Sequence, residues 1–196
     1  KFRQTRSLSF SPPDGEFIVM NYRISNNFKL PFRIHPYIEP DAKKDTIIDI
    51  TVKIRADVPH HVNSNNVEVM IPVPRTTASV SSELGYTAVS NGERTEFRKN
   101  QMLYVWSIPQ VLGGTEHILR AHINLAEPRL PGTIREVGPI SIDFEIPMHT
   151  CSGIQIKYLK ITERGQNYDP ARWIRYISQS RSYISRPTSM IEQLPS

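Results

Sequence analysis

The chain has 196 residues, 38% of them hydrophobic, and a formal net charge of +5. This length can bury a substantial core in one large or two small domains. Its one cysteine excludes an internal disulfide framework and fits a reducing compartment. No apolar run approaches the roughly 20 residues of a spanning helix. The modest charge suits an anionic membrane surface or acidic peptides better than nucleic acid.

Alternation of apolar and polar residues dominates the chain and predicts half-buried strands. It is clearest at residues 48–54, 67–73 and 140–146. Further strands are expected at Leu8–Ser11, Phe17–Ile24, Phe32–Ile38, Met102–Ile108 and Ile118–Leu125. Turn signals separate them: PPDG at 12–15, NG at 91–92, GG at 113–114 and PG at 131–132. The prediction is an all-β fold, and the uneven strands favour a β-sandwich over a barrel.

The stretch from Gly153 to Arg186 is expected to form two strands around a polar turn. In residues 154–161 the apolar parity switches, as it would at a β-bulge or where both faces are buried. The second strand carries Trp173 and Arg175 two residues apart, hence on one face of an extended chain. One helical turn from Asp169, followed by Pro170, is an alternative start.

An indole beside a guanidinium can bind another aromatic ring by stacking and can hydrogen-bond to its hydroxyl. The competing interpretation is a core tryptophan beside an arginine that extends to solvent. If the strand lies at a sheet edge, a peptide could add to it through main-chain hydrogen bonds. An apolar pocket for a second side chain would then be lined by Ile156, Leu159 and Ile174.

Other pairs of reactive residues fit ordinary structural roles. His149 and Cys151 lack further ligands at zinc spacing, and the other histidines show no HExxH pattern. Asp143 and Glu145 share a strand face, which is more typical of a solvated surface than of an acid–base pair. GxSxG and P-loop motifs are absent. We therefore predict neither an enzyme nor a metal or cofactor site.

Several segments resemble the mu homology domain of the medium subunit of clathrin-type adaptor complexes. They are SFSPPDGEFIVMNYRI, LPFRI, EVMIPVPRTT, GPISIDFEIP, SGIQIKYLKI and RWIRYI, and they span about residues 7–186 in family order. LGGTEH and IPMHTCSGIQIKYLKI are most similar to the mu subunit of the fourth adaptor complex. The resemblance implies a non-catalytic, cytosolic role in vesicular transport.

The resemblance also implies an elongated sandwich of two parts, one inserted into the other. Residues 28–148 would be the inserted part, and residues 1–27 with 149–186 would close the outer part. The outer part's first strands are then expected to precede Lys1, which makes the chain a C-terminal fragment. Residues 187–196 are expected to be a disordered tail.

The family binds tyrosine-based signals, Tyr-x-x-Φ with Φ bulky and apolar, in the cytosolic tails of membrane cargo. Carried over by position, Trp173 would pack on the signal tyrosine and Arg175 would stack on it near its hydroxyl. Ile156, Leu159 and Ile174 match the Φ pocket. The implied partners are cargo peptides and the other subunits of a heterotetramer, at the cytosolic face of trans-Golgi network or endosomal membranes and on coated vesicles.

Two departures from the family pattern qualify this implication. The acidic residue and the lysine that complete the family's tyrosine pocket belong to the strands expected before Lys1. The loop that binds phosphoinositides in the plasma-membrane member corresponds to residues 85–100, where acidic residues interrupt the basic ones. Two alternatives therefore remain: a scaffold of the same fold that recruits cytosolic partners without tyrosine signals, and a secreted sandwich domain or β-rich hydrolase.

Overall fold

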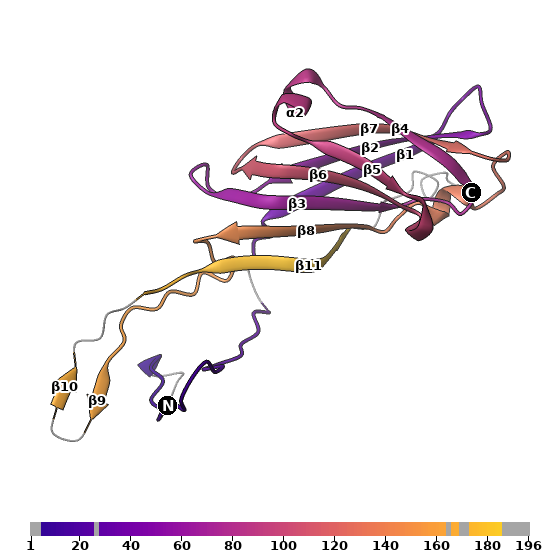
Figure 1. Ribbon diagram of the computed structural model, residues 1–196. Helices are drawn as coiled ribbons and strands as arrows, with labels where there is room; N and C mark the ends of the chain where they lie inside the picture. Colours follow the sequence, from indigo (N-terminus) through magenta and orange to yellow (C-terminus); the bar gives the residue numbers. More distant parts are fainter. Residues whose placement is uncertain (1–4, 26–27, 164–165, 169–172, 186–196) are drawn as a thin grey trace, which may run out of the picture.

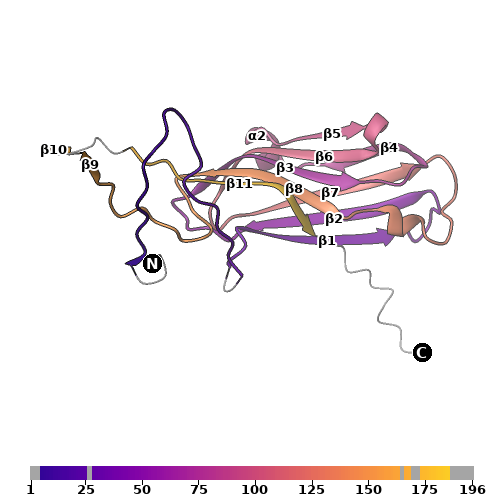
Figure 2. The same ribbon diagram turned by 90° about the horizontal axis from the view of Figure 1, so that it is seen from below.

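Alternating sequences form the strands of two antiparallel sheets that pack face to face (Figures 1 and 2). The computed structural model describes residues 5–25, 28–163, 166–168 and 173–185. One sheet has the order β1-β2-β7-β4, formed by Phe32–Pro40, Ile47–Ala56, Glu116–Leu125 and Thr77–Glu83. The other has the order β11-β8-β3-β6-β5, formed by Ile177–Ser185, Ile140–Pro147, Asn63–Pro72, Leu103–Leu112 and Arg94–Arg98. The predicted all-β sandwich is confirmed.

The core lies between the two sheets and is built from the inward half of each strand. On β2, Ile48, Ile50, Val52 and Ile54 are at most 2% exposed, and the residues between them face outward. The strand β8 alternates in the same way along its whole length. Burying an isoleucine or valine side chain stabilises a fold by about 1.5–3 kcal/mol. These strands therefore cannot shift by one residue without exposing the core.

Side-chain hydrogen bonds join the two sheets at both of their long sides. On one side the Tyr183 hydroxyl of β11 donates to the Phe32 carbonyl of β1 at 2.7 Å. On the other, the hydroxyls of Ser82 on β4 and Thr95 on β5 lie 3.0 Å apart. These bonds link the edge strands of one sheet to those of the other, which limits the exposed edges of the sandwich.

A buried carboxylate connects the sheets through the interior. Glu93, whose side chain is 3% exposed, follows the short helix α2 (Tyr86–Ser90). It accepts a 2.9 Å hydrogen bond from Trp106 Nε1 on β6 and a 2.8 Å bond from His117 Nδ1 on β7. The acid that the sequence places in a polar loop is therefore part of the core.

Short turns and 3₁₀ helices complete the sandwich, and the predicted NG, GG and PG signals at 91–92, 113–114 and 131–132 all lie in turns. The 3₁₀ helices η1 and η2 span Lys99–Gln101 and Thr133–Glu136. In the turn between β6 and β7, a Cβ on Gly113 would lie 2.0 Å from the Pro59 carbonyl oxygen, so only glycine fits there. None of the helices in the described residues has the length and apolar character needed to cross a bilayer.

Three predicted strands are not observed. Residues 8–11, 17–24 and 154–160 have no regular structure, and most of their large apolar side chains are exposed, Ile18 by 78%. The prediction of strands here was wrong because a strand needs a neighbour to receive its backbone hydrogen bonds. The described residues supply none for these segments. Side chains in and beside these segments form hydrogen bonds instead. The Tyr22 hydroxyl lies 2.7 Å from Ser152 Oγ, and the Tyr158 hydroxyl lies 2.8 Å from Ser7 Oγ.

The two strands predicted around a polar turn after residue 153 do not pair with each other: β10 (Gln166–Tyr168) lies inside the predicted turn, and the second strand pairs with β8. Strands β9 (Ile161–Glu163) and β10 form a small antiparallel sheet on an arm that extends from one end of the sandwich (Figure 1). The expected strand through Trp173 starts later, as β11 at Ile177. The helical alternative begins at residues outside those described, and so does the predicted tail at 187–196. The boundaries of the two-part division stay a prediction.

Candidate functional site

The predicted pair Trp173 and Arg175 lies on the exposed side of an extended segment that leads into β11. Exposure alternates with period two from residue 173 to residue 180, although hydrogen-bonded pairing begins only at Ile177. The Trp173 side chain is 84% exposed, and that of Arg175 is 53% exposed. Trp173 is therefore not the core tryptophan; that position belongs to Trp106, which is fully buried.

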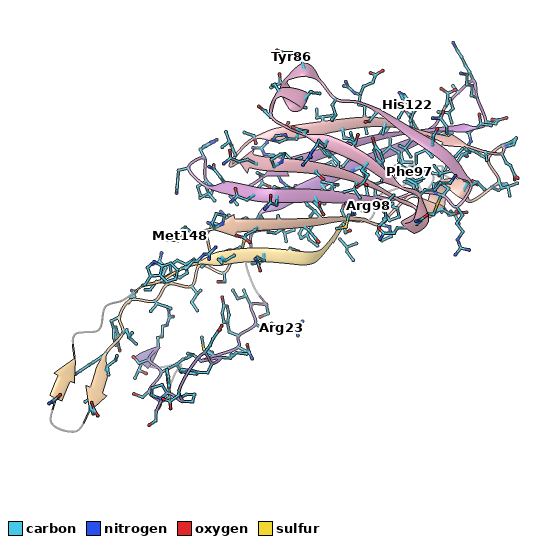
Figure 3. The ribbon with its side chains drawn as sticks, viewed as in Figure 1. Arg23, Tyr86, Phe97, Arg98, His122 and Met148 are labelled. Carbon is cyan, nitrogen blue, oxygen red and sulfur yellow. The ribbon has the colours of Figure 1, made fainter. Side chains whose placement is uncertain are left out.

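The segment is fixed at its C-terminal end by Tyr176. The Met148 amide donates to the Tyr176 carbonyl at 2.7 Å, one step beyond the last paired residues, Ile177 and Pro147. Figure 3 labels Met148 where the arm leaves the sandwich. In the described residues no backbone hydrogen bond is made by Trp173, Ile174 or Arg175.

The residues predicted for the second pocket are only partly brought together. The Ile156 amide donates to the Tyr176 hydroxyl at 2.9 Å, which joins its segment to the one that holds Trp173. Ile156 and Leu159 are 55% and 51% exposed, and Ile174 is half-buried. These apolar side chains are open to solvent, and an enclosed pocket formed by them stays a prediction.

Removing the Tyr176 hydroxyl is expected to loosen the segment of Ile156. The Tyr176→Phe substitution deletes one acceptor and keeps the ring, so local opening should cost about 1 kcal/mol less. Hydrogen exchange of the complete protein should then show faster exchange at residues 154–158. Tyr22→Phe, which removes a hydroxyl from a side-chain bond only, is the matched control. Unchanged exchange in Tyr176→Phe would contradict this role.

Acidic and polar side chains from the sandwich approach Arg175. Its Nη2 lies 3.9 Å from Glu145 Oε1 on β8. Gln179, directly opposite Glu145 on β11, donates from Nε2 to the other carboxylate oxygen at 2.8 Å. The sequence assigns Glu145 to a solvated strand face. The register of β11 against β8, which alternation cannot reveal, brings it to the arginine.

His149 and Cys151 serve the local backbone structure. The Ser178 hydroxyl donates to the His149 carbonyl at 2.8 Å and accepts from the Cys151 amide at 3.1 Å. Across the part of the chain that the structure describes, no three His, Cys, Asp or Glu side chains are grouped to hold a metal ion. The role of a turn beside a cysteine, expected from the sequence, fits these contacts.

Burial lowers the pKa of His149 below its ordinary value of 6.5, and the nearby His61 adds to this effect. The unfolded chain therefore binds this proton more readily, and stability should fall as the pH drops through the ordinary histidine range. We expect His149→Gln to flatten this fall between pH 7 and about pH 5. The measurement is the urea midpoint of the complete protein and of His149→Gln at several pH values. If both proteins show the same dependence of the midpoint on pH, His149 is not its source.

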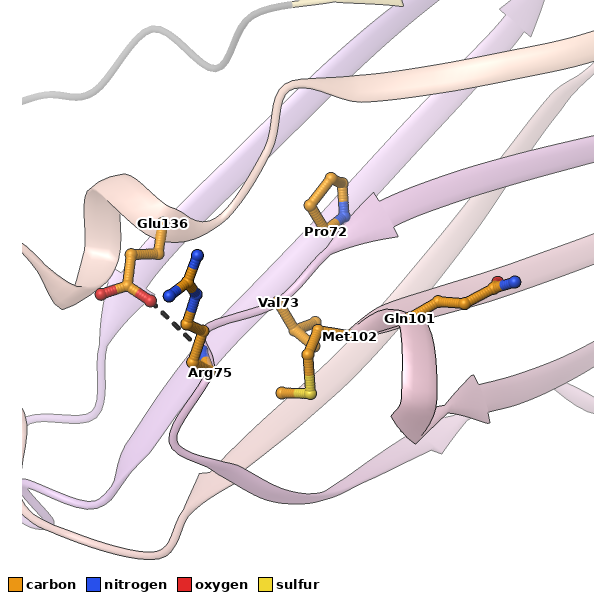
Figure 4. A pocket seen from close by; sticks show the side chains of 6 residues that line it. All are labelled: Pro72, Val73, Arg75, Gln101, Met102 and Glu136. Carbon is orange, nitrogen blue, oxygen red and sulfur yellow. Dashed lines mark hydrogen bonds between the residues drawn. The ribbon is translucent and has the colours of Figure 1, made fainter.

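A surface cavity lies at the opposite end of the sandwich from the arm. It is lined by the end of β3 and by residues near η1 and η2 (Figure 4). The Arg75 amide donates to Glu136 Oε2 at 3.2 Å across its rim. None of the residues predicted for the peptide site lines this cavity. The candidate site is thus an exposed face, and the cavity is separate from it.

The described structure is an all-β sandwich domain that presents an exposed aromatic and basic side chain on an extended segment. The chain belongs to the adaptor complexes medium subunit family, whose match covers residues 1–186. The family membership predicted from the sequence motifs is confirmed.

Proteins with related sequences agree with this membership. The AP-4 complex subunit mu of Arabidopsis thaliana is 38% identical over 185 residues, which are 94% of this chain and 40% of that protein. The AP-4 complex subunit mu-1 of Bos taurus is 32% identical over 198 residues, covering 95% of this chain and 42% of that protein. The chain thus spans about two fifths of the length of these relatives.

The fold also resembles a solved structure of low sequence identity. The yeast delta-COP-I mu-homology domain complexed with a Dsl1 WxWxV peptide has a TM-score of 0.56 and 12% identity, over 80% of this chain and 57% of that chain. This similarity supports the fold. Binding of the WxWxV peptide is reported for the yeast protein.

Proposed function

We propose that this chain contributes the cargo-recognition face of an adaptor medium subunit, which binds tyrosine-based signals in the tails of membrane proteins. One observation carries the proposal most: the Trp173 indole and the Arg175 guanidinium are both exposed on one side of an extended segment. An aromatic ring can pack on the indole while its hydroxyl accepts from the guanidinium.

The backbone of the same segment supports binding of an extended peptide. Residues 173–175 make no backbone hydrogen bond within the described chain, so a peptide strand could pair with them. Ile156 and Leu159 lie on the segment held by Tyr176 and expose apolar surface. A bulky apolar residue three positions after the tyrosine would cover this surface. The two contacts together would set the register and the specificity of the peptide.

The proposed setting is a heterotetrameric complex at the cytosolic face of trans-Golgi network or endosomal membranes. Relatives that match most of this chain are named as mu subunits of AP-4 complexes. The role is binding without catalysis, and it needs no cofactor. Short signals have few anchors and must lose the flexibility of a free tail, so we expect affinities in roughly the micromolar range.

The test is calorimetric titration of the complete protein with two peptides that differ only at the signal tyrosine. The Tyr-x-x-Leu peptide should bind with a Kd in roughly the micromolar range, and the Ala-x-x-Leu peptide should not bind measurably. A WxWxV peptide, of the kind bound by the yeast domain, serves as a comparison ligand.

The alternative is a scaffold that recruits folded cytosolic partners. It would be supported if neither tyrosine peptide bound while such a partner did. If the protein bound the WxWxV peptide but not the tyrosine peptide, the proposed tyrosine signal would be wrong. The protein would still be a peptide-binding protein.

A further inference from the structure

The carboxylate of Glu145 approaches Arg175, whose guanidinium is proposed to contact the signal tyrosine. Glu145 Oε1 lies 3.9 Å from Arg175 Nη2, and the two side chains are 35% and 53% exposed. An unrestrained arginine side chain has many rotamers and loses up to about 2 kcal/mol of conformational freedom when it is fixed. A partner that narrows these rotamers before binding reduces that loss.

Glu145 is itself held more firmly than Arg175. Its strand β8 pairs with β11 on one side and with β3 on the other, where Asn65 lies opposite Glu145. Gln179 Nε2 donates to its Oε2 at 2.8 Å, which leaves Oε1 to face the guanidinium. The sheet therefore offers a fixed negative charge at one side of Arg175.

A guanidinium has five N–H donors in a planar fork. Glu145 faces one end of that fork, and the remaining donors can reach a phenolic oxygen placed over Trp173. We propose that Glu145 is a positioning residue for Arg175 and thereby favours tyrosine over phenylalanine in the bound peptide. This inference rests on the proposed function and extends it to a residue on the sandwich.

The size of the effect follows from the exposure of the pair. Half-exposed ion pairs contribute little, so losing the charge should weaken binding of the tyrosine peptide by about fivefold and should not abolish it. A phenylalanine peptide lacks the oxygen that the guanidinium would contact. It keeps the stacking contact of the ring, so its affinity should depend less on where the guanidinium lies.

The test measures Kd for Tyr-x-x-Leu and Phe-x-x-Leu peptides on the complete protein and on Glu145→Gln. Glutamine keeps the shape and an oxygen that can accept from Gln179, and it removes the charge. The matched control is Glu68→Gln, because Glu68 lies on the same face of the neighbouring strand β3, opposite Asp143. Circular dichroism and melting temperature show that each variant is folded.

We expect Glu145→Gln to weaken binding of the tyrosine peptide about fivefold and to weaken binding of the phenylalanine peptide clearly less. Glu68→Gln should alter neither affinity. In an Arg175→Ala background the Glu145→Gln substitution should have no additional effect. Gln179→Ala is a second variant, which removes the hydrogen bond that holds the Glu145 carboxylate. It should weaken binding of the tyrosine peptide by less than fivefold.

Two results would overturn the inference while leaving the proposed function in place. One is an unchanged affinity for the tyrosine peptide in Glu145→Gln. The other is an equal loss for both peptides, which would show that Glu145 supports only the local structure. If the unsubstituted protein does not bind the tyrosine peptide at all, the proposed function fails and this inference fails with it.

Discussion

Replacing Trp173 by alanine in the complete protein is expected to reduce affinity for a Tyr-x-x-Leu peptide by about thirtyfold or more. Aromatic anchors at the centre of an interface commonly contribute 2 kcal/mol or more when truncated, which corresponds to this factor. Trp173 is 84% exposed and has no ring partner among the described residues, so the loss should not come from unfolding. Calorimetric titration measures it directly.

The matched control for Trp173→Ala is Tyr86→Ala. Tyr86 is 91% exposed on α2, which projects from the sandwich well away from Met148 and the arm (Figure 3). It removes a similar aromatic surface and should leave affinity unchanged. Arg175→Ala should weaken binding of the tyrosine peptide and narrow its advantage over a phenylalanine peptide. If Trp173→Ala and Arg175→Ala both bind as well as the unsubstituted protein, the site lies elsewhere.

Replacing Glu93 by alanine is expected to destabilise the sandwich by about 3 kcal/mol. The substitution removes the acceptor for two donors, Trp106 Nε1 at 2.9 Å and His117 Nδ1 at 2.8 Å. Each buried donor left without a partner costs about 1–3 kcal/mol. Because Trp106 and His117 lie on different sheets, the substitution should lower the stability of both sheets.

Glu93→Gln is the control for the size of this effect. Glutamine keeps one acceptor for Trp106, and its NH₂ group can donate to His117 in the other tautomer. Hydrogen exchange of the β6 and β7 amides in the complete protein should therefore be accelerated strongly in Glu93→Ala and weakly in Glu93→Gln. Equal protection in Glu93→Ala and the unsubstituted protein would show that the network contributes little.

The strands of the core could be predicted from the sequence because each buries one face. On β2 and β8 the apolar residues alternate without a break, and both strands are found where the alternation places them. The edge strands β4 and β5 could not be found in this way. Their sequences, TASVSSE and RTEFR, each contain one large apolar residue, and it is their pairing with β7 and β6 that makes them strands.

The predicted strands at residues 17–24 and 154–160 show the opposite error. Their composition favours a strand, yet strand formation also requires a neighbouring chain, and composition carries no information about one. The same limitation explains the late start of β11. The prediction of an extended, alternating backbone at residues 173–176 was correct. The pairing of this segment begins only where β8 is available, at Pro147.

Within the candidate site, the spacing of Trp173 and Arg175 predicted their common exposed side. The contribution of Glu145, Gln179 and Tyr176 could not be predicted, because each depends on the register between segments far apart in the chain. A register that places residue 179 opposite residue 145 leaves no periodic signal in either strand. The family resemblance supplied the peptide hypothesis, and the contacts around Arg175 come from the structure.

The most direct measurement of the central claim is hydrogen exchange of the complete protein with and without a saturating Tyr-x-x-Leu peptide. Binding along the Trp173 face should slow exchange at residues 154–160 and 173–178, since a paired peptide covers those amides. Exchange at α2 and η1, on other parts of the sandwich, should not change. Protection at α2 or η1 with none at residues 173–178 would contradict the claim.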